Sequence, residues 1–270
     1  TLKIHPLFRV MAIGALCFLY VPLFAVAVFS INASRFGLAW KGFTLDWYFQ
    51  LASNSVVLEA ARNTLFLAVV STIVSTVLGT AVAIGLKRHP WGRRWNGFFD
   101  LVLHLPVVTP EIVFAAALVI AFAMLRYVSS LFDPGMLNMV IGHITFQIAF
   151  VALVVGSRLA AISTKIEEAA RDLYADNLFM LRHVTLPLLR PGIVAGAMLA
   201  FTMSLDDFVI SFFTAGPSSM TLPLYIYAQV RRGVTPDIHA LSTIVLLITI
   251  LAVVVAERFS RTSTKEKKHA

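Results

Sequence analysis

Three carboxylates stand inside long apolar runs of this sequence. Asp206 and Asp207 are adjacent, and Glu111 follows Pro106 and Pro110 in an earlier run. If these runs cross a membrane, each charged carboxylate costs at least a few kcal/mol, so such residues usually face a cavity or a partner. Spaced acids of this kind suit a chain of ammonium groups, which makes a pathway for a cationic solute the first chemical hypothesis.

The two adjacent aspartates cannot serve the same purpose on one helix, because neighbouring side chains point about 100° apart. One could line a pathway while the other caps, pairs or contacts a second subunit. Tyr225, Tyr227 and Phe212 could add cation–π contacts of about 0.5–2 kcal/mol each. The structural alternative is that the acids cap broken helices or pair with Arg231 or Arg232.

Residues 158–190 form a charged, helix-prone segment between apolar runs, called here the polar segment. Thr164 and Glu167 fit a capping box, which predicts a helix that starts at Thr164 and runs on through 168–173. Ala169 and Ala170 are small as well as helix-favouring, so another protein's backbone could approach them closely.

A second short helix is predicted after Asp176, which with Asn177 can supply its N-cap, and this helix is expected to end before Pro187. Pro191 follows Arg190 and suits the first turn of the next apolar helix. Connections between helices are usually shorter than this segment. Its length therefore favours a structured contact site over an ordinary solvated loop.

Sequence signatures of the common enzyme classes are absent. There is no Gly-x-x-x-x-Gly-Lys-Ser/Thr loop for ATP, no His-Glu-x-x-His and no Gly-x-Ser-x-Gly. Cys17 is the single cysteine and has no acidic or histidine neighbour at ligand spacing. The histidines are scattered and predict no metal site; they are His5, His89, His104, His143, His183, His239 and His269.

The elements that must position these residues are membrane spans. Of the 270 residues, 59% are hydrophobic and only 13% are charged, and the mean hydropathy is +0.84. Soluble domains have about 25% charged residues, so an all-α integral membrane protein is indicated. The runs do not alternate with period 2, which excludes a barrel. With about 20 residues needed per span, we predict six spans, at about 10–32, 62–86, 101–126, 136–158, 191–213 and 238–257.

Six spans place both termini on one side, and the basic residues indicate which side. If the termini are cytoplasmic, the inner segments hold sixteen Lys and Arg residues and the outer segments six, as the positive-inside rule requires. The net charge of +8 is then a topology signal rather than a mark of nucleic-acid binding. The polar segment becomes cytoplasmic, and segments 33–61 and 214–237 lie outside. The first apolar run lacks a small-residue cleavage site and is expected to be a span rather than a signal peptide.

The chain divides by this topology into three parts. Residues 1–61 hold the first span and an outer loop, 62–257 the core transmembrane domain and 258–270 a basic cytoplasmic tail. The outer loop carries Trp40, Trp47 and Tyr48, for which an interfacial aromatic belt is favoured over a partner contact. Segment 214–237 is too apolar for a solvated loop and too short to span, which suggests a re-entrant piece. Its two arginines suit either docking to an acidic protein or an interfacial anchor.

The polar segment resembles a known signature. Glu168-Ala169-Ala170, then Tyr174, then nine residues to Val184, then Leu186-Pro187, is similar to the "EAA" pattern of bacterial ABC importer permeases. In that family this helix is a coupling helix that docks in a cleft of a cytoplasmic ATPase. The resemblance implies this role for Glu168, Ala169, Ala170, Arg171 and Asp172, with Leu186 and Pro187 closing the pattern. The chain departs from it at Tyr174, where the family usually has glycine, the residue that most readily takes a left-handed helix end.

Further motifs resemble the spermidine/putrescine (polyamine) permeases over nearly the whole chain. They are Ser34-Arg35-Phe36-Gly37, Trp47-Tyr48, Leu105-Pro106 with Pro110-Glu111, His143-Ile144-Thr145-Phe146, Ser204-Leu205-Asp206-Asp207, Gly216-Pro217 and Leu222-Pro223-Leu224-Tyr225-Ile226-Tyr227. The resemblance implies a type I ABC importer permease fold and a pathway lined by Asp206, Asp207, Glu111, Tyr225 and Tyr227.

It also implies the assembly around the chain. The expected partners are a second homologous permease, two ATPase subunits, an external polyamine-binding protein and membrane lipid, in a bacterial inner membrane. No cofactor is expected in this chain, since ATP and Mg would bind to the partner ATPase. An importer for another small solute and a stand-alone ion-coupled carrier remain as alternatives; the carrier should show inverted repeats with paired broken helices, and none is evident here.

Overall fold

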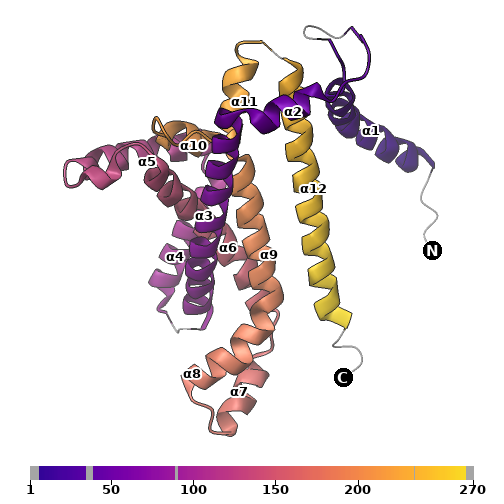
Figure 1. Ribbon diagram of the computed structural model, residues 1–270. Coiled ribbons are helices and arrows are strands. Elements are labelled where there is room, and N and C mark those ends of the chain that lie inside the picture. The colour runs from indigo at the N-terminus through magenta and orange to yellow at the C-terminus, as the bar shows by residue number, and fades with distance from the viewer. Residues whose placement is uncertain (1–5, 35–38, 89–90, 234, 266–270) are drawn as a thin grey trace. The chain divides into compact units, whose positions relative to one another are not determined.

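The protein is built from helices, as the sequence predicts. The computed structural model describes residues 6–34, 39–88, 91–233 and 235–265, and within these residues β pairing is limited to one isolated bridge, between Asn32 and Phe43. Figure 1 shows the order of the helices along the chain. Arg35, Phe36 and Gly37 of the predicted motifs lie outside the described residues, as do Lys3, His5, His89, Lys267, Lys268 and His269.

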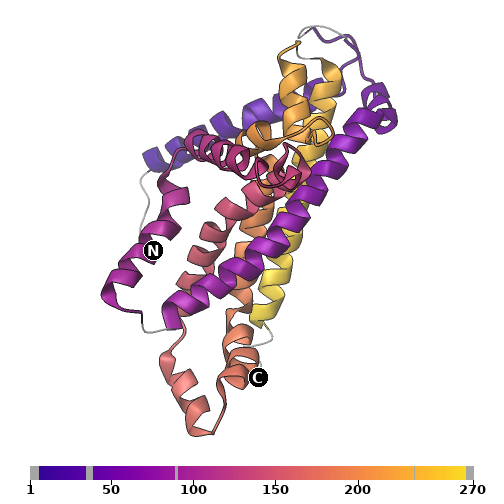
Figure 2. The ribbon, with the colours of Figure 1, turned by 90° about the vertical axis from the view of Figure 1, so that its left-hand side faces the viewer.

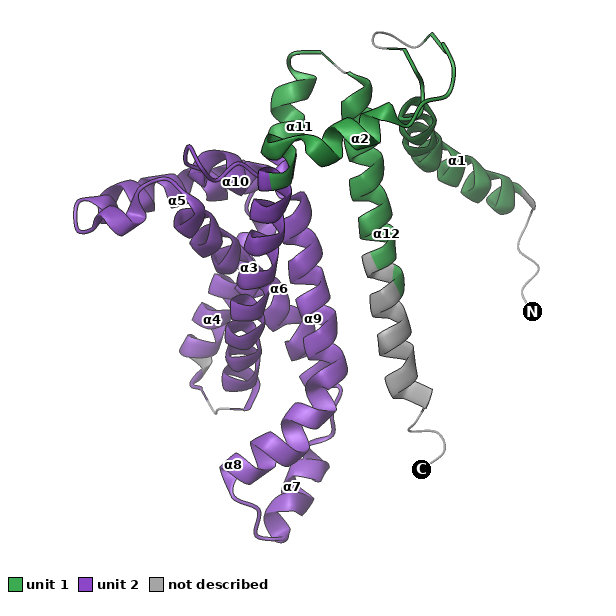
Figure 3. Cartoon of the chain, viewed as in Figure 1, with its two compact units in different colours: residues 1–58, 225–255 green, residues 59–224, 256–270 purple. Residues whose placement is uncertain are grey.

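The chain falls into two compact units, which are coloured separately in Figure 3. The first comprises residues 1–58 and 225–255. Its helices are α1 (Pro6–Phe29), α2 (Asp46–Ser53), most of α11 (Leu222–Val230) and α12 (Pro236–Lys265) as far as residue 255.

Aromatic residues organise the loop of the first unit. The Trp47 indole is 9% exposed and donates a hydrogen bond of 2.9 Å to the Asn32 carbonyl. The Tyr48 hydroxyl lies 2.7 Å from the Ser30 hydroxyl, whereas Trp40 is 54% exposed. Trp40 thus has the exposure of an interfacial anchor, while Trp47 is part of the loop's own core.

The second unit comprises residues 59–224 together with 256–270 and contains the three carboxylates and the polar segment. Its elements are most of α3 (Ser55–Arg88), α4 (Arg93–Val108), α5 (Glu111–Arg126), the short 3-10 helix η1 (Ser130–Phe132), α6 (Met136–Ala160), α7 (Thr164–Asp172), α8 (Asn177–Met180), the π-helix η2 (Leu181–Thr185), α9 (Leu186–Asp206) and α10 (Val209–Thr214).

Helix α6 forms the centre of this unit. It packs against α9, α4 and α10, and its residues Val151 and Val155 are fully buried in a cluster with Leu189 and Ala200 of α9. Helix α3 runs alongside, as the turned view in Figure 2 shows, and joins the same cluster through Ala83. Helices in membranes pack closely where small residues let their backbones approach, and the alanines in this cluster serve that purpose.

The six predicted spans correspond to helical regions, but the boundaries differ. Four described helices are long and apolar enough to span, at 7–29, 55–88, 136–160 and 177–206, and a bent pair could make a fifth. The apolar helix at 236–251, in the sixth predicted span, is shorter. The count of six is therefore approximate.

Two predicted spans are not single helices. The span predicted at 101–126 consists of α4 and α5, which meet at 111°. Pro110 sits at this break, since a proline has no N–H with which to continue the helix. The span predicted at 191–213 begins earlier, because α9 already starts at Leu186, so Pro191 lies inside the helix and not in its first turn as predicted. It also ends earlier, because α9 stops at Asp206 and a new helix begins at Val209.

Gly79 provides a direct test of the packing of α3 on α6. A Cβ atom at Gly79 would lie 2.7 Å from the Val151 Cβ, whereas one at Gly85 of the same helix would meet nothing within 4 Å. Gly79→Ala should destabilise the fold by about 1–3 kcal/mol through overpacking, and Gly85→Ala should be neutral or stabilising by up to about 1 kcal/mol. Thermal unfolding of both variants in detergent measures this difference; equal midpoints would contradict the packing described here.

Candidate functional site

The three carboxylates singled out by the sequence come together at two helix breaks. Asp206 is the last residue of α9, Asp207 follows it directly, and Glu111 is the first residue of α5. Helix α5 packs against α10, and Glu111 lies close enough to both aspartates for their charges to interact. Asp206 and Glu111 are exposed, whereas Asp207 is 4% exposed.

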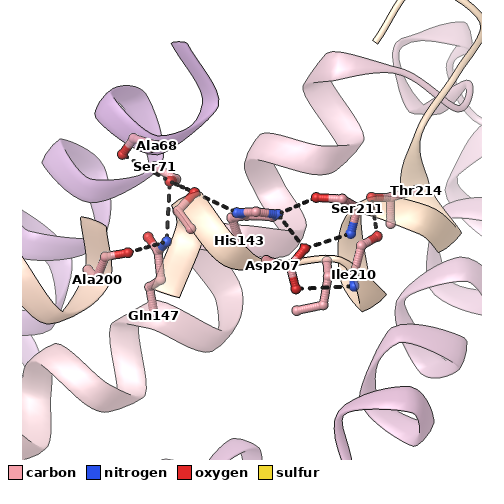
Figure 4. Close-up of polar contacts among 10 residues, drawn as sticks. Ala68, Ser71, His143, Gln147, Ala200, Asp207, Ile210, Ser211 and Thr214 are labelled. Atoms are coloured by element: carbon pink, nitrogen blue, oxygen red, sulfur yellow. Dashed lines mark hydrogen bonds and ion pairs between the residues drawn. The ribbon is translucent and has the colours of Figure 1, made fainter. Parts of the chain in front are cut away.

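Asp207 caps the second half of a broken helix. Its carboxylate accepts hydrogen bonds from the backbone N–H of Ser211 at 2.8 Å and of Ile210 at 3.3 Å. The His143 Nε2 lies 3.0 Å from the same carboxylate, and both side chains are fully buried. Figure 4 shows these contacts converging on Asp207. The helix-capping alternative drawn from the sequence is thus realised at Asp207.

His143 extends this contact into a buried polar network (Figure 4). Its Nδ1 lies 2.7 Å from the Ser204 hydroxyl, and its Nε2 lies 3.1 Å from the Ser211 hydroxyl. The Ser204 hydroxyl is 3.2 Å from that of Ser71 in α3. One imidazole therefore ties α6 to α9 and α10, and through Ser204 to α3.

Gln147, one turn after His143, makes a second set of contacts across the same helices. It donates to Ser71 at 3.3 Å and to the Ala200 carbonyl at 3.1 Å, and it accepts a hydrogen bond of 2.9 Å from Ser75. Sequence reasoning missed this network. The available signal was the four-residue spacing of His143 and Gln147 inside an apolar run, which places both on one helix face.

Of the three carboxylates, only Asp207 is part of the buried network, so Asp206 and Glu111 remain available to contact a solute. Asp207 accepts hydrogen bonds from two backbone amides and lies against the His143 imidazole. Within the described part of the chain, no Lys or Arg forms a salt bridge with Asp206 or Glu111. Exposed and without a basic partner, these two acids can attract a cation. Phe212 of α10 is 53% exposed and supplies an aromatic face in the same unit.

Tyr225 and Tyr227 belong to α11 in the first unit. Tyr225 is 6% exposed and Tyr227 is 41% exposed. The Arg231 guanidinium lies 5.8 Å from the centre of the Tyr227 ring. Their predicted contact with a solute stays a prediction.

The polar segment forms helix α7, but its N-cap is not the predicted one. Ser163 caps the helix through its side chain, which accepts a hydrogen bond from the Lys165 amide, and Thr164 is the first helical residue. Either hydroxyl can serve as a cap, so two adjacent candidates make the start ambiguous by one residue. Glu168, Ala169, Arg171 and Asp172 are exposed on the helix, and Ala170 is half-buried.

Tyr174 takes the conformation that glycine would take. Its φ is 60°, the single positive φ at a non-glycine position among the described residues. The Tyr174 amide donates to the Arg171 carbonyl at 2.9 Å, and the Ala175 amide donates to the Ala170 carbonyl at 3.0 Å. This pair of bonds is a Schellman turn. The tight turn therefore forms although glycine takes this conformation more readily than tyrosine, and the Tyr174 ring is 98% exposed.

The second short helix does not end where the sequence predicts. Asp176 does cap α8, as expected, accepting a hydrogen bond of 2.6 Å from the Phe179 amide. The chain then continues through η2 directly into α9, so the helix does not end before Pro187. Pro187 lies directly after the π-helical turn η2, where the regular α-helical hydrogen bonding is already interrupted, so its missing N–H is tolerated there. Leu186 and Pro187 are both half-buried.

Comparison with known proteins places this geometry in a family. The profile of the binding-protein-dependent transport system inner membrane component family matches residues 75–265. The chain is 38% identical over 248 residues to the spermidine/putrescine transport system permease protein PotC of Escherichia coli (strain K12), covering 92% of this chain and 91% of that protein. It is 37% identical over 230 residues to the putrescine transport system permease protein PotI of the same organism, covering 85% and 82%.

Solved structures confirm the fold. A bacterial alginate ABC transporter, in complex with an alginate pentasaccharide-bound periplasmic protein, contains a chain that superposes with a TM-score of 0.77. The match covers 96% of this chain and 94% of that chain at 19% sequence identity. The predicted all-α permease fold is therefore correct, although the sequences have diverged widely.

The two adjacent aspartates should differ sharply in their effect on stability. Asp207→Ala leaves His143 and two buried amides without their acceptor and should cost about 3–5 kcal/mol. Asp206→Ala removes an exposed side chain and should change stability by no more than about 0.5 kcal/mol. Thermal unfolding of the two variants in the same detergent measures both effects. Asp207→Asn keeps the shape and one acceptor oxygen, so it should fall between them; a larger loss for Asp206→Ala would contradict the assignment.

Proposed function

Since the chain belongs to the family of inner membrane components of binding-protein-dependent transport systems, we propose that it is the permease subunit through which an ATP-driven importer passes polyamines into the cell. The observation that carries the cargo assignment is the pair of exposed carboxylates, Asp206 and Glu111, at two neighbouring helix breaks. The identity to PotC and PotI, whose names specify spermidine and putrescine, supports it.

The two acids suit a flexible cation that carries several charges. A polyamine is a chain of ammonium groups separated by methylenes, so separate carboxylates along a pathway can each contact one charge while apolar walls accept the methylenes. Phe212 adds an aromatic face, with which an ammonium group interacts favourably by about 0.5–2 kcal/mol. Because these acids are exposed rather than enclosed, each contact is weak, which favours release over retention.

Transport requires a motor, and this sequence has no phosphate-binding loop of its own. We assign coupling to the exposed face of α7 with Glu168, Ala169, Ala170, Arg171 and Asp172. Four large apolar side chains beside that face are more than half exposed and suit a cleft in a partner; they are Leu173, Tyr174, Leu178 and Phe179. The partner ATPase would bind ATP and Mg and carry out the hydrolysis.

The assembly we propose has a second similar permease, two ATPase subunits and an external polyamine-binding protein. Helix α1 supports a protein or lipid partner, because none of its spanning window is buried within this chain. The distribution of the basic residues supports a cytoplasmic position for the polar segment and both termini. The stand-alone carrier is no longer supported, since the family works with binding proteins.

Asp206→Asn should weaken solute recognition without weakening the fold. Removal of one charge from a cation contact is worth about 1–1.5 kcal/mol, so the KM for spermidine uptake by the assembled complex should rise roughly five- to tenfold. Asp100→Asn provides a control, because Asp100 is an exposed acid on α4. Radiolabelled uptake with competition by putrescine measures the effect; unchanged KM in Asp206→Asn and in Glu111→Gln would contradict the pathway.

Glu168→Arg should separate the ATPase from the permease. It reverses an exposed charge on the proposed docking face, and like charges brought together at an interface cost several kcal/mol. Co-purification of the ATPase with the tagged permease should therefore be lost. Glu59→Arg, which reverses another exposed acid near the far end of α3, is the matched control. Retention of the ATPase by Glu168→Arg would exclude α7 as the docking helix.

A further inference from the structure

Glu167 and Glu168 are neighbours in sequence but face different surroundings. Glu168 is exposed, whereas the Glu167 side chain is only 14% exposed. Adjacent residues on a helix point about 100° apart, so when one glutamate faces outward on α7 its neighbour turns toward the rest of the unit. The family signature accounts for Glu168 but leaves the inward glutamate without a role.

The inward glutamate joins three elements at a single oxygen atom. The Glu167 Oε1 lies 3.0 Å from the Nε of Arg88, the last residue of α3. The same oxygen accepts a hydrogen bond of 3.4 Å from the Thr185 hydroxyl, at the end of η2. Thr185 is 4% exposed, and the Arg88 side chain is 23% exposed. A contact sheltered in this way is screened less by water than a surface ion pair.

We propose that Glu167 is a positioning residue that makes α7, α3 and α9 move together when the ATPase moves α7. This inference rests on the proposed function, because it assumes that α7 is the helix that the ATPase contacts. Arg88 ties α7 to the end of α3, and Thr185 ties it to the start of α9. Glu167 therefore links the docking helix to two long helices at once.

The π-helix is what makes the Thr185 contact effective. A π-helical turn is rare and marks functional positions in many helices, and η2 is the segment that joins α8 to α9 without a break. A pull on Thr185 therefore acts on the least regular turn of a continuous helix. Helix α9 has 21 residues, or about 32 Å at 1.5 Å per residue, and its far end is Asp206. Displacement at Glu167 can thus reach Asp206 through one helix.

The geometry also leaves the ion pair room to tighten. The Arg88 Nη2 is buried and has no hydrogen-bond partner among the described residues, and the recorded salt bridge joins Nε to a single carboxylate oxygen. An arginine and a carboxylate can form two parallel bonds. A small movement of α7 could bring the second carboxylate oxygen of Glu167 to Nη2. The contact would then have two hydrogen bonds in place of one, which gives it two distinct states.

The test measures solute transported per ATP hydrolysed by the complete complex in liposomes. Glu167→Gln and Arg88→Met should each keep the ATPase bound, unlike Glu168→Arg, and keep hydrolysis within about twofold of wild type. Uptake should fall roughly tenfold, so the ratio of uptake to hydrolysis falls with it. Thr185→Val, which removes only the hydroxyl, should lower the ratio less. Arg94→Met, which removes an exposed arginine of α4, should leave the ratio unchanged.

A charge swap provides the decisive variant. Arg88→Glu combined with Glu167→Arg restores a pair of opposite charges and should recover much of the lost ratio. Equal loss of uptake and hydrolysis in the single variants, or a swap no better than either of them, would overturn the proposal. Failure of the wild-type complex to take up polyamine would instead contradict the proposed cargo. The role of Glu167 could still be tested, because the ratio of uptake to hydrolysis can be measured with any solute that the complex transports.

Discussion

The structure depends on one requirement, that every polar group at a broken helix inside an apolar layer must find a partner. Helix α9 ends at Asp206, and α10 begins at Val209. The buried carboxylate of Asp207 accepts hydrogen bonds from the first amides of α10, and the His143 Nε2 lies 3.0 Å from it. Without this pair the break would leave unpaired amides and an unpaired acid in the same buried place. The break in turn leaves Asp206 exposed beside Glu111.

Helix α9 connects Asp206 to the polar segment. Helix α9 carries Asp206 at one end and follows η2 at the other, while α6, buried along much of its length, holds it in place through apolar contacts and through Gln147. Solute contact and ATPase contact are thus proposed for opposite ends of one rigid element. A coupled transporter needs such a physical link, because the ATPase and the solute never meet.

Much of this arrangement could be predicted from residue types and spacing. Carboxylates inside apolar runs identified Glu111 and Asp206, and the Glu-Ala-Ala spacing identified α7. Pro106 and Pro110 both predict an interruption of the third span, but only Pro110 stands at the 111° bend, whereas Pro106 lies inside α4 without ending it. Hydropathy alone does not distinguish the two prolines. The sequence could not tell which of the two aspartates is buried, because the buried side chain that contacts Asp207 is His143, 64 positions earlier. At Tyr174 the Schellman bonds of the surrounding turn overrode the preference for glycine.

The central claim is that Asp206 lines a water-filled path for a cation while its neighbour is sealed in the fold. Asp206→Cys, introduced into a Cys17→Ala chain, tests it within the assembled transporter. A membrane-impermeant, positively charged thiol reagent should label this cysteine, and spermidine should slow the labelling. Ala200→Cys, at a fully buried position of the same helix, should stay unlabelled. Labelling of Asp206→Cys that is absent, or that spermidine does not slow, would contradict the account.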